Sequence, residues 1–161
     1  MNWREYLFSV KGRVSRVHYW KILLATVGVG LTSNLVITQA VGISFHDFGR
    51  EVSGDGLWSA AGRQVLAFML PVWAVTIALT NAIYVKRLHD RNRSGWWLIL
   101  MVYGPWVTDF VLRAFYDPHS ITHMLIRGTS NLLGLWGFIE LGFLPGTRGA
   151  NRFGPDPLQK A

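Results

Sequence analysis

Two long hydrophobic runs separated by a densely basic turn constrain this chain more than any other feature. Residues 65–85 carry no charged side chain, and residues 96–112 carry only Asp109. A run of about 20 apolar residues is long enough to cross a hydrocarbon core of roughly 30 Å as one helix. The turn between the two runs holds five Lys, Arg or His residues. Because basic residues near the ends of a span favour the cytoplasmic side, this pattern predicts two membrane helices joined by a cytoplasmic turn.

The composition supports a membrane-embedded chain. Hydrophobic residues make up 50% of the 161 residues and charged residues only 16%, which is more apolar than an average soluble domain. The net charge of +7 is therefore interpreted as an orientation signal rather than as a nucleic-acid-binding surface. The chain has no cysteine, which excludes disulfides, thiolate nucleophiles and Cys-ligated metal sites.

Two further hydrophobic runs complete the predicted architecture. Residues 22–45 are free of charge, whereas residues 128–144 form a shorter run that contains Glu140. Apolar residues at helical spacing within residues 3–10 predict a short amphipathic helix in the membrane interface. We therefore predict an all-α membrane protein in one integral membrane domain, residues 1–161. Its four transmembrane helices span about residues 20–43, 65–85, 96–114 and 126–144, with a cytoplasmic tail over 145–161.

The distribution of basic residues predicts how these helices are oriented. The segments placed inside carry twelve Lys and Arg residues, and those placed outside carry four. This positive-inside bias favours four crossings with both termini in the cytoplasm.

Several carboxylates are predicted to act as structural polar clamps. Asp109 precedes Arg113 by four residues, the favourable order for a helical ion pair. Glu140 lies one turn from the cytoplasmic end of the last span, within reach of the basic turn. Asp90 and Asp156 lie among arginines, so each is expected to pair with a basic residue from another segment.

Arg13 or Arg16 is expected to be one of these partners. An unpaired buried charge is costly, so such pairs should contribute to stability. An alternative for the carboxylates within the spans is an ion or solute path lined by Asp109 and Glu140. The His119 and His123 pair has a chelating spacing but lacks the accompanying Glu of a zinc-protease motif, so no metal site is predicted.

Three short signatures share the predicted inner face. They are Gly12-Arg13 with Ser15-Arg16 and Tyr19-Trp20, then residues 86–90 with 94–97, then Gly149 with Asn151 and residues 154–157. In this order they resemble the bacterial inner-membrane family known as domain of unknown function 805. The resemblance covers nearly the whole chain and implies a small multi-pass protein of the bacterial inner (plasma) membrane. It carries over no catalytic residues.

The functional hypothesis from the sequence is a non-enzymatic module whose basic inner face binds anionic lipid headgroups or a partner protein. Clustered arginines offer planar donors that suit phosphate oxygens, and freed amides between Gly149 and Gly154 would add an anion-binding nest. The candidate residues are Arg13, Arg16, Arg87, Arg91, Arg93, Arg148 and Arg152. No nucleophile, phosphate loop or metal-binding spacing favours an enzyme, and no cofactor is predicted. Membrane lipids are the expected partners, with a protein partner or self-association as the alternative, and nucleic acid is not expected.

Overall fold

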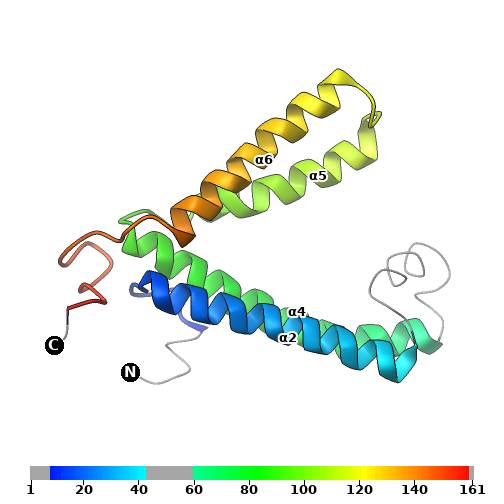
Figure 1. Cartoon of the computed structure of the whole chain (residues 1–161), viewed down its shortest axis with the longest axis horizontal. Helices are drawn as coiled ribbons and strands as arrows, with labels where there is room; N and C mark the ends of the chain where they lie inside the picture. The colour runs from blue at the N-terminus through cyan, green and yellow to red at the C-terminus, as the bar shows by residue number, and fades with distance from the viewer. Residues whose placement is uncertain (1–7, 43–59, 160–161) are drawn as a thin grey trace. The chain divides into compact units, whose positions relative to one another are not determined.

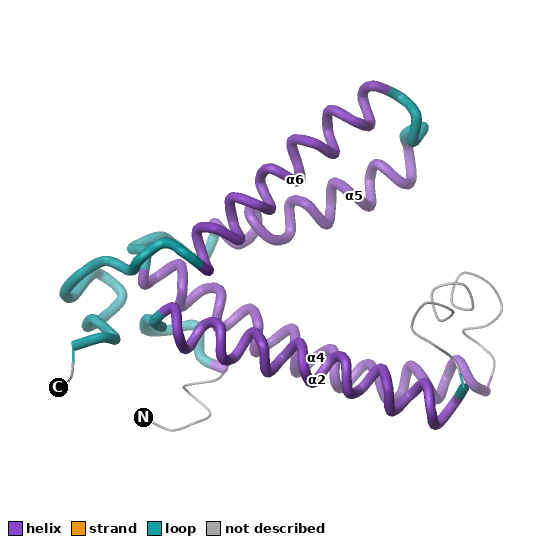
Figure 2. Tube along the Cα trace, in the orientation of Figure 1, coloured by secondary structure: helices purple, strands orange, loops and turns teal. Residues whose placement is uncertain are grey.

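A computed structural model describes residues 8–42 and 60–159 of the chain. Within these ranges every regular element is a helix, as the all-α prediction requires (Figures 1 and 2). The elements are α2 (Arg16–Val41), α4 (Ala60–Asp90), the π-helical turn η2 (Ile99–Tyr103), α5 (Gly104–Phe115) and α6 (Ile121–Gly142). The amphipathic helix predicted near residues 3–10 lies largely outside the described residues.

Two of the helices are long and apolar enough to cross a membrane. These are 22 residues of α2, Arg16–Ile37, and 29 residues of α4, Gly62–Asp90. At a rise of 1.5 Å per residue, the shorter of them spans about 33 Å, which matches a bilayer core. Leu24, Leu31 and Leu35 of α2 are each more than 60% exposed. A core helix of a soluble protein would bury such residues, so their exposure favours a surrounding lipid phase.

The contacts of the chain divide it into two compact units. The first unit comprises Met1–Phe8 with Lys21–Asn81, and the second comprises Ser9–Trp20 with Ala82–Ala161. In the first unit, α2 and α4 meet through a small core in which Ile37 packs with Val65 and Met69 and is flanked by Trp73. In the second unit, α5 and α6 pack as neighbours, with η2 against α6.

The first half of the basic turn, residues 86–90, is the last part of helix α4. Helix α4 continues through Asp90, so the chain changes direction only beyond that residue. Asn92 adopts a left-handed conformation with φ of 56°, its N–H donates to the carbonyl of His89, and Arg93 N–H donates to that of Leu88. This bond pair is a Schellman motif, which satisfies carbonyls that a helix end otherwise leaves unpaired.

The third predicted span is divided at Gly104. The N–H of Gly104 donates to the carbonyl of Ile99, five residues back, so the chain makes one π-helical turn before α5. Pro105 explains this turn, because it has no N–H and its ring would clash with the Met101 carbonyl in a regular α-helix. Gly137 of α6 accommodates the displaced backbone, since a Cβ there would lie 2.8 Å from the Met101 Cβ.

The last predicted helix begins earlier than expected. Helix α6 starts at Ile121 rather than near residue 126, because Ser120 caps it by accepting the His123 N–H at 3.2 Å. Asp109 of α5 accepts from Arg113 at 2.8 Å, which is the predicted local pair. Arg127 of α6 also lies 3.6 Å from this carboxylate.

Candidate functional site

Four segments of the second unit meet where α4 and α6 end. They are the stretch from Gly12 to Trp20, the last turns of the two helices, and the tail that follows α6. Six of the seven arginines proposed from the sequence form a side-chain hydrogen bond in this part of the unit, and Arg148 lines a pocket there. We call this region the polar junction.

The tail after α6 caps the end of α4. Thr147 donates to the Asp90 carbonyl through its N–H at 2.8 Å and through Oγ1 at 3.0 Å. The amide Nδ2 of Asn151 donates to the His89 carbonyl at 2.9 Å. Because each last carbonyl of a helix needs a donor, these bonds hold the tail against α4. The tail is therefore an ordered part of the polar junction.

The end of α6 is capped by side chains from the stretch Gly12 to Trp20 and from the last turns of α4. Trp20 Nε1 donates to the Gly142 carbonyl and Arg16 Nη1 to the Phe143 carbonyl, both at 2.9 Å. Arg87 Nε donates to the Leu141 carbonyl at 2.7 Å. The carboxyl end of a helix carries partial negative charge, so two guanidinium groups are favourable there.

Asp90 lies at the centre of a buried charge cluster formed with Arg13 and Arg87, which we call the Asp90 cluster. The side chains of the two arginines are 1% and 0% exposed, and that of Asp90 is 4% exposed. Arg13 Nη2 and Nε donate to Asp90 Oδ1 at 3.0 and 3.1 Å, and Arg87 Nη1 donates to Oδ2. The structure thus contains the Arg13 pairing expected from the sequence.

The tail passes so close to this cluster that only glycine fits. A Cβ on Gly146 would overlap the Asp90 carboxylate. The Asp90 cluster has two arginines for one carboxylate, and backbone carbonyls of the tail stabilise the charge of Arg13. Arg13 donates to Thr147 and Gly149 at 2.5 and 2.6 Å.

A second cluster surrounds Glu140, whose side chain is 2% exposed. Arg91 Nε and Arg93 Nε donate to Glu140 Oε1 at 3.1 and 2.7 Å. The Arg93 guanidinium also lies over the rings of Trp97 and Trp136, at 5.1 and 5.8 Å from their centroids. In the structure, Glu140 thus contacts two arginines that follow the end of α4.

Asp156 differs from its expected role. Among the residues that the structure describes it forms no ion pair, and its carboxylate accepts the N–H of Gly149 at 2.9 Å and of Leu158 at 3.0 Å. These two bonds, with the Leu158 bond the larger cause, hold the pKa of Asp156 below its ordinary value. The Gly149 N–H was predicted to belong to a binding site for an external anion. In the structure it donates to the Asp156 carboxylate instead.

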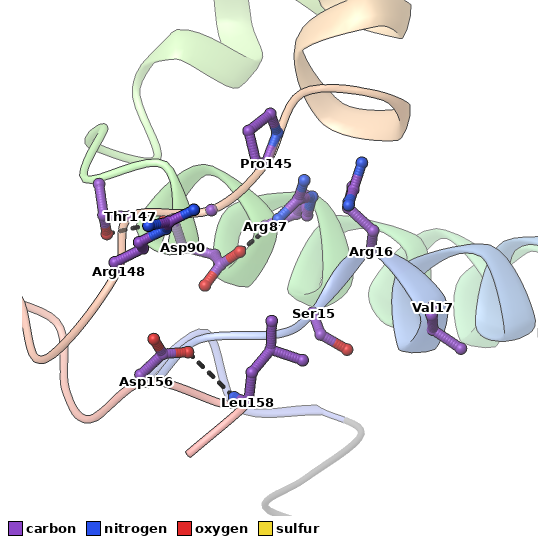
Figure 3. Close-up of a pocket in the computed structure, with 11 residues that line it drawn as sticks. Ser15, Arg16, Val17, Arg87, Asp90, Pro145, Thr147, Arg148, Asp156 and Leu158 are labelled. Carbon is purple, nitrogen blue, oxygen red and sulfur yellow. Dashed lines mark hydrogen bonds and ion pairs between the residues drawn. The ribbon is translucent and has the colours of Figure 1, made fainter.

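A pocket of about 180 Å³ opens beside the Asp90 cluster. Its wall includes Arg16, Arg148 and Asp156 together with the apolar side chains of Val17 and Leu158 (Figure 3). Both arginines are exposed. The pocket therefore combines two accessible guanidinium groups, the Asp156 carboxylate and apolar side chains.

Arg152 points elsewhere. Its Nη2 donates to the Asn92 carbonyl at 3.1 Å, and its guanidinium lies 4.7 Å over the Phe153 ring. Phe153 in turn stacks on His89 with a centroid separation of 3.8 Å. In the described residues no group of three or more His, Asp or Glu side chains is placed to hold a metal ion.

The seven arginines are not distinguished from one another by any sequence pattern. Arg13 and Arg87 donate their hydrogen bonds to the Asp90 carboxylate and to backbone carbonyls. Arg16 and Arg148 are exposed and line a pocket. The capping role of Trp20 was also not predicted. The one local signal was Pro145-Gly146 directly after a hydrophobic run, which indicates a fixed turn where the chain leaves the helix.

The chain is similar to known proteins over nearly its whole length. Over 160 residues the chain is 29% identical to the uncharacterized protein YiiR of Escherichia coli K12, covering 97% of this chain and 90% of YiiR. It is 28% identical over 148 residues to the inner membrane protein YhaH of the same organism, covering 91% and 85% of the two chains. The inner membrane protein YhaI of that strain is 27% identical over 146 residues, covering 91% and 83%.

No solved structure matches the chain. A family model does match, over residues 7–155, which include every segment of the polar junction up to Pro155. The chain therefore belongs to the family described as protein of unknown function DUF805.

Proposed function

We propose that the chain is a non-enzymatic, multi-pass module of the bacterial inner membrane whose polar junction faces the cytoplasm. In this proposal the pocket beside the Asp90 cluster binds the phosphate of an anionic lipid headgroup. Two relatives that carry the name inner membrane protein support the location, as do the two apolar helices. The excess of basic residues on one side supports the orientation.

The proposed topology has four crossings with both termini inside. Reporter domains that are active only outside the membrane should give signal when fused after Ser120 and none when fused after Asn92 or Lys160. The alternation follows from twelve basic residues on the inner segments against four on the outer ones. Signal from the Lys160 fusion would contradict a crossing by the last hydrophobic run.

The observation that carries the binding proposal is the position of Arg16 and Arg148 at the pocket. In the described part of the chain no hydrogen bond or ion pair involves the Arg148 side chain, and Arg16 uses only Nη1, for the Phe143 carbonyl. Their remaining N–H groups are free to donate to phosphate oxygens, which suit a planar guanidinium. Each of the two buried clusters also contains two arginines for one carboxylate, which adds positive potential nearby.

The apolar wall favours a lipid over a free anion. Val17 and Leu158 line the same pocket as the two arginines. A headgroup phosphate at the arginines would leave the glycerol region and first methylenes of a lipid against these side chains. An inorganic phosphate would leave Val17 and Leu158 exposed to water. Its binding would therefore gain no free energy from burial of apolar surface.

A carrier that uses Asp109 and Glu140 is less well supported. Glu140 is held by Arg91 and Arg93, and Asp109 pairs with Arg113 and lies near Arg127. A carboxylate that binds and releases an ion in a membrane would need to exchange partners, and both of these are already paired with arginine.

The pocket is tested by removing its two exposed cations. The Arg16→Gln/Arg148→Gln variant should retain less phosphatidylglycerol or cardiolipin in native mass spectrometry from detergent micelles. Each arginine near an anionic headgroup contributes about 1 kcal/mol, so the apparent affinity should fall roughly 30-fold. The matched control is Arg113→Gln/Arg127→Gln, which removes the same charge from the region around Asp109. Equal retention by both variants would assign Arg16 and Arg148 to orientation alone, and displacement of a bound protein would point to the partner alternative.

A further inference from the structure

The first unit contains an apolar groove between α2 and α4, with a volume of about 540 Å³. Side chains from two turns of each helix line it, including Val29 of α2 and Pro71 and Val75 of α4. From Lys21 to Val29 the groove follows α2 for roughly 12 Å at the helical rise of 1.5 Å per residue. It lies within the two helices that are long enough to cross a membrane.

The two threonines in the groove do not make it polar. Thr26 Oγ1 donates to the carbonyls of Ile22 and Leu23 at 2.6 and 2.9 Å. Thr76 Oγ1 donates to the carbonyls of Val72 and Trp73 in the same way. Since each hydroxyl hydrogen is used by the helix that carries it, the groove has no free hydroxyl donor to offer an occupant. An occupant here gains free energy by burying hydrocarbon.

One end of the groove carries a positive charge. Lys21 lines it, is exposed, and forms none of the ion pairs found within residues 8–42 and 60–159. Lys21 lies little more than one turn after the start of α2, and a long lysine side chain near the end of a membrane helix extends its ammonium group to the headgroup level. The groove thus matches a molecule that has a hydrocarbon body and an anionic end.

We propose that this groove binds one acyl chain of an anionic phospholipid, with the phosphate of that lipid at Lys21. The site is independent of the pocket at Arg16 and Arg148, because all its lining residues belong to the first unit. Pro71 lies inside α4 and lines the groove, where its ring replaces a backbone N–H and adds apolar surface. The apolar walls select the chain, and Lys21 selects the charge of the headgroup.

The test fills the groove with aromatic rings and counts bound lipid. The full-length chain is purified in micelles that contain phosphatidylglycerol and phosphatidylcholine with the same acyl chains, and native mass spectrometry records the lipids retained. All proteins carry Arg16→Gln and Arg148→Gln, so the proposed headgroup pocket does not contribute. In this background, Val29→Phe/Val75→Phe should lose the retained lipid. The matched control Val27→Phe, on α2 but outside the groove lining, should retain it.

Lys21 is tested separately through the choice of headgroup. Lys21→Gln should still retain one lipid but lose the preference for phosphatidylglycerol over phosphatidylcholine, by about fivefold for one lysine near the headgroups. Lys21→Arg should keep the preference. Val75→Phe alone serves as the groove variant if the double substitution prevents folding.

Three results would overturn the proposal. The first is unchanged lipid retention in the groove-filled variant. The second is an equal loss in Val27→Phe, which would mean non-specific association around the helices. The third is a change of oligomeric state or a large loss of thermal stability with lipid retention intact, which would assign the groove to another helix of this chain or of a second copy. Failure of the Arg16 and Arg148 pocket would leave these outcomes unaffected.

Discussion

Replacing Asp90 by asparagine is expected to destabilise the protein more than any other single carboxylate substitution. The change keeps the size of the side chain but leaves Arg13 and Arg87, whose side chains are 1% and 0% exposed, without their shared counter-ion. Removing one partner of a buried charge pair costs about 3 to 5 kcal/mol of unfolding free energy. Denaturant titration of the detergent-solubilised protein measures this loss.

The matched control for Asp90→Asn is Asp109→Asn. Asp109 is also paired with two arginines, but its side chain is 39% exposed and those of Arg113 and Arg127 are 73% and 50% exposed. Exposed pairs contribute about 0 to 1 kcal/mol, so the control should unfold nearly like the unsubstituted chain. Equal and small effects of the two substitutions would show that Asp90 is solvated and that the junction does not depend on it.

Arg87→Lys is expected to have the second-largest effect although it keeps the charge. The guanidinium of Arg87 donates simultaneously to the carbonyls of Leu141 and Leu144 and to the Asp90 carboxylate. A lysine ammonium is a compact donor that cannot reach all three acceptors from one position. A buried acceptor left without a donor costs about 1 to 3 kcal/mol. Because the Leu144 bond is only partly buried, the loss for the variant is expected to be on the order of 2 to 4 kcal/mol.

Thermal unfolding in detergent, followed by circular dichroism, measures the effect of Arg87→Lys. The control is Arg113→Lys, in which the only bond affected among residues 8–42 and 60–159 is the exposed pair with Asp109. If both lysine variants keep the melting temperature of the parent, then stability depends on the positive charge of residue 87 and not on the several hydrogen bonds that its guanidinium donates. If Arg87→Lys alone loses stability, its lipid binding should be compared only below the lower melting temperature.

The arginines of the polar junction differ in burial: Arg13 and Arg87 have buried side chains, whereas Arg16 and Arg148 are exposed. A variant that removes Arg87 or Arg13 is expected to destabilise the fold, because both side chains are buried in the Asp90 cluster. A loss of binding in such a variant would therefore not identify a binding residue. Substitutions of Arg16 and Arg148 change accessible charge with less effect on that cluster, since both side chains are exposed. Binding experiments on this family should therefore begin with the exposed pair.

The sequence by itself determined the elements and the local pairs. Long runs without charge identify α2 and α4, because an uncharged stretch of that length has one stable form in lipid. The spacing of four residues determined the Asp109 and Arg113 pair, since positions i and i+4 are neighbours on any helix. The need of a buried carboxylate for a cation predicted that Asp90 pairs with a basic residue from another segment, with Arg13 among the candidates, and that Glu140 lies within reach of the basic turn.

Only the tertiary structure decided which arginines hold the protein together and which remain accessible. The acceptors that distinguish them are backbone carbonyls of Leu141, Phe143, Leu144, Thr147 and Gly149. Every residue carries the same carbonyl, so no sequence pattern marks the ones that a helix end or a tail leaves unpaired. The choice between Arg87 in the core of the junction and Arg148 at its pocket is made by where those carbonyls lie in space, and that depends on how the end of α6 and the tail fold against α4.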